Sequence, residues 1–141
     1  MKRILVPVDG SPLAKRACQV AKNLASKFDS EIILVTVVTK PARVVRDGLM
    51  GYMDDEVARK VEVAEKMLLE IKEDFEDMSE KVEIQALAGD IAGEILACAN
   101  REQADLIVMG SRGLGVFSGA ILGSISTKIV HSSEVSVLIV K

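Results

Sequence analysis

The fold is indicated most clearly by residues 105–124, which read DLIVMGSRGLGVFSGAILGS. The stretch opens with Asp105–Met109, which is almost entirely apolar, as in a strand that is covered on both faces. A run rich in glycine and serine follows from Gly110 to Leu122, and a short helix is expected to begin at about Ser124. A buried strand, a glycine-rich loop and a helix in this order are typical of an open α/β sheet.

The rest of the chain alternates apolar runs of strand length with segments of helical period. We predict five strands, over Arg3–Val8, Ile32–Val38, Val82–Ala88, Asp105–Met109 and Val135–Val140. We predict four helices, one from the Ser11–Pro12 cap to Asp29–Ser30, one over about Asp54–Met78, one opened by Gly89–Asp90 and one over about Ser124–Ser132. The third strand alternates apolar and polar residues, which suits an edge of the sheet.

Strands that alternate with helices predict a doubly wound α/β fold, a parallel sheet with helices on both faces. Ligands of such folds bind outside the carboxyl ends of the strands, where the strand order reverses. We therefore expect a site built from the ends of the first and fourth strands, at Pro7–Ser11 and from Met109 onward.

Length and composition indicate one globular domain over residues 1–141, with 49% apolar and 28% charged residues. The formal net charge of -3 argues against nucleic acid or an anionic membrane as partner. The densest apolar run, Ile32–Val38, is too short to span a bilayer, and Pro7 and Asp9 interrupt the N-terminal run too early for a signal peptide. We therefore expect a cytoplasmic protein, in which Cys18 and Cys98 are small buried hydrophobes.

The glycine-rich stretch has the features of an anion cradle. Glycines let backbone N–H groups approach phosphate oxygens without a side chain in the way. The helix that begins at Gly123–Ser124–Ile125 adds unpaired N–H groups and the positive end of its dipole. The hydroxyls of Ser124 and Ser126 could donate further hydrogen bonds, and Arg112 could neutralise phosphate charge.

Other phosphate-binding motifs fit the sequence less well. The P-loop pattern GxxxxGK[ST] is absent. A dinucleotide loop would follow the first strand rather than the fourth, with an acidic residue at the end of the next strand. The first turn, Asp9–Pro12, also lacks the serine- and glycine-rich loop of the ATP-pyrophosphatases, whose sheet is related.

The glycine spacing resembles that of a known family. Gly110, Gly113 and Gly123, followed by Ser124, match the signature G-2x-G-9x-G-[S/T] of the ATP-binding branch of the universal stress protein family. The resemblance covers essentially the whole chain. It extends to three further segments, Ile4–Ser11, Ala88–Asp90 with Ile95, and Asp105–Ser111.

This resemblance implies a five-stranded parallel sheet of order 3-2-1-4-5 with an ATP site between strands one and four. Carried over by position, the resemblance places Pro7, Val8 and Asp9 at the adenine and ribose end of the nucleotide. It places Val37 against the adenine, partly through its backbone. Met109 and Gly110 would lie beneath the ribose. The resemblance assigns the phosphates to Arg112, Gly113, Gly123, Ser124, Ile125 and Ser126. Mg²⁺ or Mn²⁺ would be held mainly by phosphates and water, because no carboxylate cage is evident.

The last strand departs from the family pattern. Members commonly have proline before its apolar run, where this chain has Ser136. The resemblance implies a homodimer in which this strand pairs with its copy, and a serine N–H could shift the register of that pairing. An exposed edge formed by Val137, Leu138, Ile139 and Val140 would otherwise be an aggregation risk.

Several residues keep more than one interpretation. Asp9 either contacts the ligand or caps the turn before the first helix, and Arg112 either contacts phosphate or is solvated at a loop tip. The glycines of the signature could also be turn-forming residues without a ligand. The long segment 39–53, with Met50, Tyr52 and Met53, either folds over the nucleotide or packs at a dimer surface.

The resulting functional hypothesis is an ATP-binding regulatory or stress-response module with little intrinsic hydrolysis, because no general base is evident near the predicted phosphates. No catalytic residue is predicted. One alternative is a slow or partner-activated ATPase, for which Asp9 is the candidate base. The other is a dimeric interaction module that binds no nucleotide.

Overall fold

The computed structural model describes residues 1–40, 50–115 and 121–141, with side chains from residue 54 onward in the second range. The described strands are β1 (Arg3–Pro7), β2 (Glu31–Val38), β3 (Val82–Ala88), β4 (Leu106–Gly110) and β5 (Ser136–Val140). The described helices are α1 (Pro12–Phe28), α2 (Met50–Glu73), α3 (Ile91–Arg101), α4 (Ser124–Ser132) and the 3₁₀ helix η1 (Glu76–Lys81).

The strands form one parallel sheet of order β3-β2-β1-β4-β5, which confirms the predicted fold class and the edge position of β3. The register between β1 and β2 runs from Arg3↔Glu31 to Pro7↔Val35. The ladder between β1 and β4 holds only Ile4↔Leu106 and Leu5↔Ile107. Beyond Leu5 the two central strands are therefore no longer joined, and this is where the strand order reverses.

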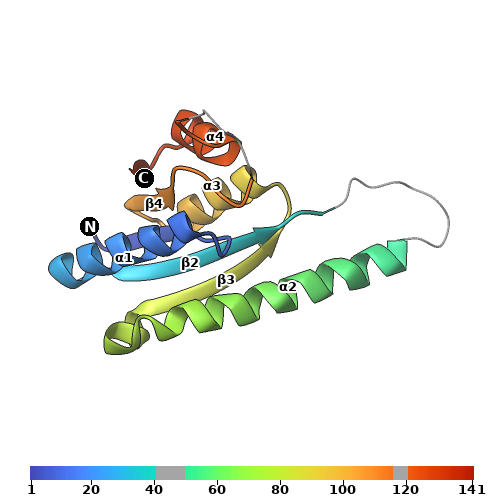
Figure 1. Ribbon diagram of the computed structural model, residues 1–141, viewed down its shortest axis with the longest axis horizontal. Helices are drawn as coiled ribbons and strands as arrows, with labels where there is room; N and C mark the ends of the chain where they lie inside the picture. The colour runs from blue at the N-terminus through green and yellow to red at the C-terminus, as the bar shows by residue number, and fades with distance from the viewer. Residues whose placement is uncertain (41–49, 116–120) are drawn as a thin grey trace.

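Helices cover both faces of the sheet (Figure 1). On one face, α1 and α2 bury a cluster that includes Ile4, Leu34 and Leu68. On the other face, α3 and α4 bury a second cluster around Leu5 and Ile107. Neighbouring residues of one strand thus enter opposite cores, which explains why the central strands show apolar runs without alternation.

The helix caps follow the predicted signals. The Ser11 hydroxyl accepts a hydrogen bond from the Ala14 N–H at 3.2 Å, and Pro12 occupies the first turn. The helix α1 ends at Phe28, and the following residue Asp29 has a left-handed φ of 56°, as is common after a helix C-terminus. Asp90 caps α3 by accepting from the Gly93 N–H at 2.9 Å.

The predicted bounds of the second helix were wrong at both ends. The helix α2 begins at Met50 rather than Asp54, and it ends at Glu73 rather than Met78. Phe75 and Met78 lie beyond it but remain buried, so the apolar spacing continues although the α-helix does not. The alternatives for segment 39–53 cannot be compared, because residues 41–49 and the side chains of 50–53 lie outside the described part of the chain.

A lysine of α1 binds the residues that follow the C-terminal end of α2. The Lys22 ammonium donates to the Asp74 carbonyl at 2.7 Å and pairs with the Asp77 carboxylate at 2.6 Å. It also lies 5.7 Å from the centroid of the Phe75 ring. A cation that binds carbonyls beyond a helix C-terminus favours ending the helix there.

The amino ends of the strands are closed by polar contacts. Asp105 accepts the N–H groups of Lys2 and Arg3 at 2.5 and 3.0 Å, which hold the pKa of its carboxyl below the ordinary value. Arg3 in turn pairs with Glu31 at 2.8 Å and with Glu102 at 3.3 Å. This end of the sheet thus satisfies its polar groups internally.

Both cysteines are buried, as expected. Burial of Cys18 between α1 and the sheet raises the pKa of its thiol to about 12, and burial also raises the pKa of the Cys98 thiol. Within the described ranges, no helix combines the length and the apolar character needed to cross a bilayer.

Two adjacent leucines of α2 test its packing. Leu68 is fully buried, whereas Leu69 is 54% exposed. We expect Leu68→Ala to lower the free energy of unfolding by about 2–5 kcal/mol, because it removes buried methyl groups and leaves a cavity. The matched control Leu69→Ala should change it by less than about 0.5 kcal/mol. Urea unfolding measures both free energies. Equal losses of stability from the two variants would contradict the structure, in which Leu68 faces the core and Leu69 faces water.

Candidate functional site

A cavity of about 460 Å³ lies at the carboxyl ends of the strands, where β1 and β4 separate. This volume is in the range of small-molecule sites. All twelve residues predicted from the sequence line the cavity: Pro7, Val8, Asp9, Val37, Met109, Gly110, Arg112, Gly113, Gly123, Ser124, Ile125 and Ser126. Residues up to 119 positions apart in the chain are thus brought together by the reversal of strand order.

Eight residues of the lining were not among the predicted ligand contacts, although Ser11, Leu114 and Gly115 lie within the two segments expected to form the site. They are Ser11, Ala14, Val35, Thr36, Ile91, Ile95, Leu114 and Gly115. Ile91 and Ile95 are one helical turn apart on α3 and form an apolar wall, and the buried Thr36 hydroxyl donates to the Val8 carbonyl. The helical spacing of Ile91 and Ile95 indicated that they are buried. It could not show that they face the cavity, because residues that face only the core have the same spacing.

The Asp9 carboxylate joins the turn after β1 to the loop after β4. Its Oδ1 accepts the Ser11 N–H at 2.9 Å, within a turn in which Gly10 has a φ of +80°. Its Oδ2 accepts the Leu114 N–H at 3.1 Å. Asp9 therefore caps the turn before α1 and reaches the glycine-rich loop with its second oxygen, and its contact with a ligand stays a prediction.

The three glycines of the signature meet different constraints. A Cβ on Gly110 would lie 2.9 Å from the Leu13 Cβ and 3.1 Å from its carbonyl carbon, so Gly110 lets the loop pass close to α1. A Cβ on Gly113 would lie 2.4 Å from Oδ2 of Asp9. A Cβ on Gly123 would meet its nearest neighbours at 3.5 Å or more, which is ordinary contact. Packing thus requires glycine at Gly110 but not at Gly123, whereas at Gly113 a side chain would displace only the exposed carboxylate of Asp9.

The helix α4 begins at the cavity with a cap that provides no side-chain acceptor. Gly123 is its N-cap, and the Gly123 N–H donates to the Ser111 carbonyl at 2.7 Å. The buried Ser126 hydroxyl also donates to the Ser111 carbonyl, at 2.7 Å. Ser126 therefore holds the loop in place, and the first-turn N–H groups of Ser124 and Ile125 remain as the natural anion donors.

The backbone of Val37 faces the cavity beyond the end of β1. The Val35 carbonyl accepts the Val8 N–H at 2.8 Å, whereas the Val38 carbonyl accepts the Gly89 N–H at 2.9 Å, on the opposite side of β2. Because backbone groups alternate along a strand, the N–H and C=O of Val37 point to the same side as those of Val35. That side has no strand partner here, because the ladder between β1 and β2 ends at Pro7↔Val35.

The lining contains one residue of each charge. Among the described residues that line the cavity, Asp9 and Arg112 are the charged ones, and both are exposed. Arg112 is thus solvated at the edge of the cavity, and its contact with phosphate stays a prediction. Most of the polar groups that converge on the cavity are therefore backbone groups and serine hydroxyls.

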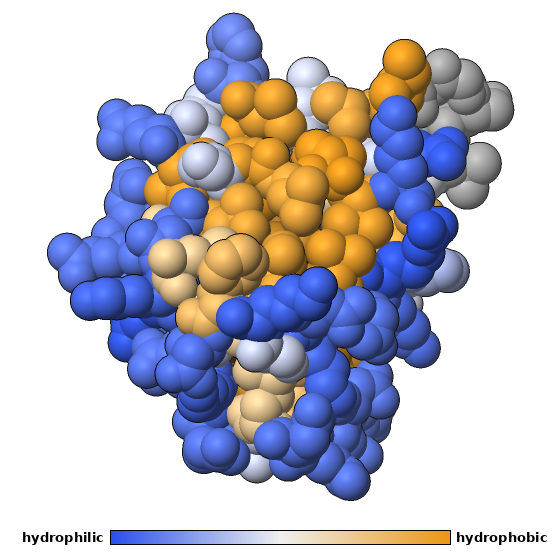
Figure 2. Space-filling view, turned by 90° about the vertical axis from the view of Figure 1, so that its left-hand side faces the viewer, coloured by the Kyte–Doolittle hydropathy of each residue, from blue (hydrophilic) through white to orange (hydrophobic). Residues whose placement is uncertain are grey.

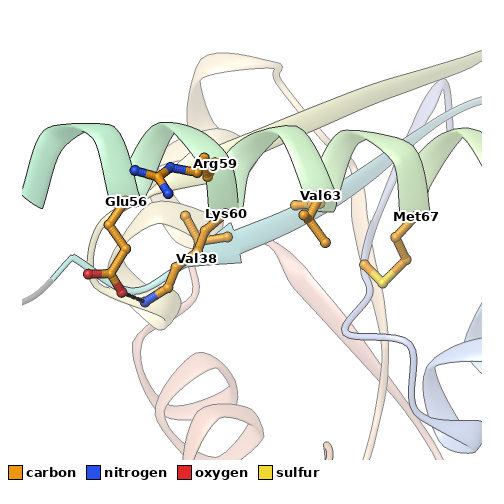
Figure 3. A pocket seen from close by; sticks show the side chains of 7 residues that line it. Val38, Glu56, Arg59, Lys60, Val63 and Met67 are labelled. Carbon is orange, nitrogen blue, oxygen red and sulfur yellow. Dashed lines mark ion pairs between the residues drawn. The ribbon is translucent and has the colours of Figure 1, made fainter. Parts of the chain in front are cut away.

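A second hollow of about 390 Å³ lies beneath α2, on the other side of β2 (Figure 3). Its lining is Val38, Glu56, Arg59, Lys60, Val63, Ala64 and Met67. The polar groups do not converge on it, because Lys60 pairs with Glu56 at 2.9 Å along the helix. It is an open strip of apolar surface, and the cavity between β1 and β4 is the better candidate for a ligand site.

The chain belongs to the universal stress protein family, whose model matches residues 1–141. A universal stress protein of Thermus aquaticus is 37% identical over 141 residues, which cover 99% of this chain and 98% of that protein. This relationship agrees with the resemblance carried by the glycine signature.

Solved structures of the family share the fold. The universal stress protein UspA from Lactobacillus plantarum matches with a TM-score of 0.88 and 22% identity, covering 99% of this chain and 97% of that one. A universal stress protein from Archaeoglobus fulgidus, solved in complex with dAMP, matches with a TM-score of 0.61 and 18% identity over 100% and 98% of the two chains. At these identities the likeness shows the sheet order and the layers.

The contacts of the glycines predict unequal effects on stability. We expect Gly110→Ala to lower the free energy of unfolding by about 2–3 kcal/mol, because the new methyl group would collide with Leu13 of α1. Gly123→Ala should change it by less than about 1 kcal/mol in either direction, because the added methyl group fits. Chemical unfolding of the ligand-free proteins checks both values. A larger loss from Gly123→Ala would show that Gly123 is constrained by packing.

Proposed function

We propose that this universal stress protein binds ATP in the cavity between β1 and β4 and acts as a regulatory or stress-response module of the cytoplasm. The proposal rests on one observation, that three backbone features line the same cavity. These are the unpaired strand edge at Val37, the loop that Gly110 and Gly113 allow to pass close by, and the N-terminus of α4. Together they suit a ligand with a flat polar ring at one end and phosphates at the other.

The phosphates are proposed to lie at α4. The N–H groups of Ser124 and Ile125, the positive end of the helix dipole and the N–H groups of the loop would donate to phosphate oxygens. Arg112 would approach them from the loop. Helices α1 and α3 carry the caps Ser11 and Asp90, whereas the cap of α4 offers only backbone.

The base is proposed to be adenine, read by the backbone of Val37. The Watson–Crick edge of adenine presents an amino donor beside a ring-nitrogen acceptor, which complements one C=O and one N–H. Guanine presents a carbonyl acceptor beside an N–H donor at the same two positions and would face like groups. The apolar walls formed by Val8, Ile91 and Ile95 suit the faces of the ring.

The ribose is proposed to lie over Met109 and Gly110, between the base and the loop. Its hydroxyls would come within reach of the carboxylate of Asp9, an acceptor. Pro7 and Val8 would border the junction of base and sugar. The dAMP complex of the Archaeoglobus fulgidus protein is consistent with an adenine nucleotide as the ligand class in this family.

A divalent cation, Mg²⁺ or Mn²⁺, is proposed to accompany the triphosphate. In residues 1–40, 54–115 and 121–141, no group of three His, Cys, Asp or Glu side chains gathers to hold a metal. The cation would therefore take its ligands mainly from phosphate oxygens and water, as Mg²⁺ commonly does. Its role would be to neutralise phosphate charge.

Turnover is proposed to be low. Among the described lining residues, Asp9 is the one carboxylate, and it is proposed to face the ribose rather than the phosphates at α4. Such a group is poorly placed to activate water. A slow or partner-activated ATPase is the alternative, and Asp9→Ala would then abolish phosphate release by the purified protein.

A homodimer is proposed through β5. Apolar residues gather on the face shown in Figure 2, which includes the side of the molecule where the chain ends. The edge strand β5 carries Leu138, which is 37% exposed, and the neighbouring α4 carries Val130, which is 46% exposed. A second copy that pairs along Val137, Leu138, Ile139 and Val140 would cover this edge, and Ser136 could donate a hydrogen bond that proline could not.

Leu138 provides a test of the dimer. We expect Leu138→Lys to weaken self-association, because a charge would be placed in the apolar contact. Sedimentation equilibrium of the wild type and the variant over a range of concentrations measures the effect. Leu69→Lys, on exposed α2 surface, is the matched control and should leave association unchanged. A wild type that stays monomeric at every concentration would rule out this interface.

Nucleotide preference is the direct test of the proposed function. We expect ATP at 100 times its dissociation constant to stabilise the protein by about 2.7 kcal/mol. GTP at the same concentration should stabilise it much less, because its base presents the reversed pattern to Val37. Gly123→Val should remove the effect of ATP by filling the space before α4, while Leu69→Ala should keep it. Thermal unfolding in the presence of Mg²⁺ reports all four.

Two outcomes of this experiment would contradict the proposal. Equal stabilisation by ATP and GTP would mean that the Val37 backbone does not read the base. A melting curve that ATP leaves unmoved would favour the dimeric interaction module without nucleotide.

A further inference from the structure

A carboxylate is bound to the glycine-rich loop within the protein itself. Oδ2 of Asp9 accepts the Leu114 N–H at 3.1 Å, across 105 residues of sequence. The loop lies so close to this carboxylate that a Cβ on Gly113 would be 2.4 Å from the same oxygen. The loop amide that the carboxylate occupies is of the kind that phosphate oxygens use in glycine-rich cradles.

Of residues 112–115, which form the described tip of the loop, Leu114 is joined to the turn after β1 by the hydrogen bond from its N–H to Asp9. The ends of the loop are anchored elsewhere, by Ser111 N–H to the Val140 carbonyl at 2.8 Å and by Gly123 N–H to the Ser111 carbonyl at 2.7 Å. Residues 112–115 are all exposed, and the Leu114 side chain is 70% exposed, so apolar packing contributes little there. The position of the tip therefore depends on the Asp9 carboxylate.

A polyphosphate and this carboxylate cannot both use the Leu114 N–H well. One N–H makes one strong hydrogen bond, and two anions held a few ångströms apart repel each other. The cavity is open to water, so the repulsion is moderate, but it acts on every phosphate that enters. Arg112 is the one described cationic residue of the lining that could offset it.

We infer that Asp9 is an internal competitor of the phosphates, which occupies the loop amide in the free protein and must leave it when a nucleotide binds. The inference rests on the proposed function and adds a regulatory step to the same site. Binding exchanges a carboxylate for a phosphate oxygen at Leu114 and releases Asp9 toward the ribose. The tip of the loop is consequently held by the protein in one state and by the ligand in the other.

Isothermal titration with sodium tripolyphosphate, which has phosphates but no base or sugar, tests the competition. We expect Asp9→Asn to bind tripolyphosphate about five- to tenfold more tightly than the wild type, because it loses the competing charge. Adenosine, which has no phosphates, should gain nothing from the same substitution. Asp105→Asn is the matched control, because Asp105 also accepts two backbone N–H groups but lies at the opposite end of the sheet. It should leave tripolyphosphate binding unchanged.

NMR titration of the wild type tests the inference even if the Asp9→Asn variant does not fold. In the wild type, titration with tripolyphosphate should move the NMR signals of the Leu114 amide and of the Asp9 carboxyl carbon together. Movement of the amide without the carboxyl carbon would overturn the inference, as would unchanged or weaker tripolyphosphate binding by Asp9→Asn.

The outcomes also separate this inference from the proposed function. If ATP stabilises both the wild type and Asp9→Asn but tripolyphosphate affinity does not rise, only the competition is wrong. If ATP and tripolyphosphate bind to neither protein, the nucleotide site is wrong and the inference fails with it.

Discussion

The structure depends on the short ladder between β1 and β4. Two residue pairs, Ile4↔Leu106 and Leu5↔Ile107, join the central strands, and beyond them the strands no longer pair. On one side β1 continues beside β2, and on the other β4 continues beside β5 to Gly110↔Val140. The carboxyl end of the sheet is consequently split into two pairs of strands with a cavity between them, while the amino end is closed around Asp105. Every feature proposed for ligand binding lies on that cavity.

Because strand ends and a helix start form the cavity, its binding groups are mostly backbone groups. Among the described residues that line the cavity, the charged ones are Asp9 and Arg112. The low turnover proposed for this site follows from that composition, because bond-making chemistry needs positioned acids and bases. The Asp9 carboxylate accepts one of these backbone groups, the Leu114 N–H.

The sheet and the residues that line the cavity could largely be predicted from the sequence, because buried parallel strands and the G-2x-G-9x-G-[S/T] spacing are local patterns. The same patterns could not locate the end of α2, because Phe75 and Met78 stay buried after the helix has ended. Nor could they show that Gly110 lies against Leu13 and Gly113 against Asp9, whereas Gly123 is free of such close contacts. Spacing identifies a glycine, but the neighbour that requires it comes from a distant part of the chain.

The most direct measurement is a crystal structure grown with Mg²⁺ and a non-hydrolysable ATP analogue. We expect phosphate oxygens within hydrogen-bonding distance of the N–H groups of Ser124 and Ile125, and the base against the Val37 backbone. The Leu114 N–H should then donate to the ligand, with the Asp9 carboxylate turned away from it. A nucleotide bound elsewhere, or a cavity that stays empty in excess analogue with Asp9 still bonded to Leu114, would contradict the proposed site.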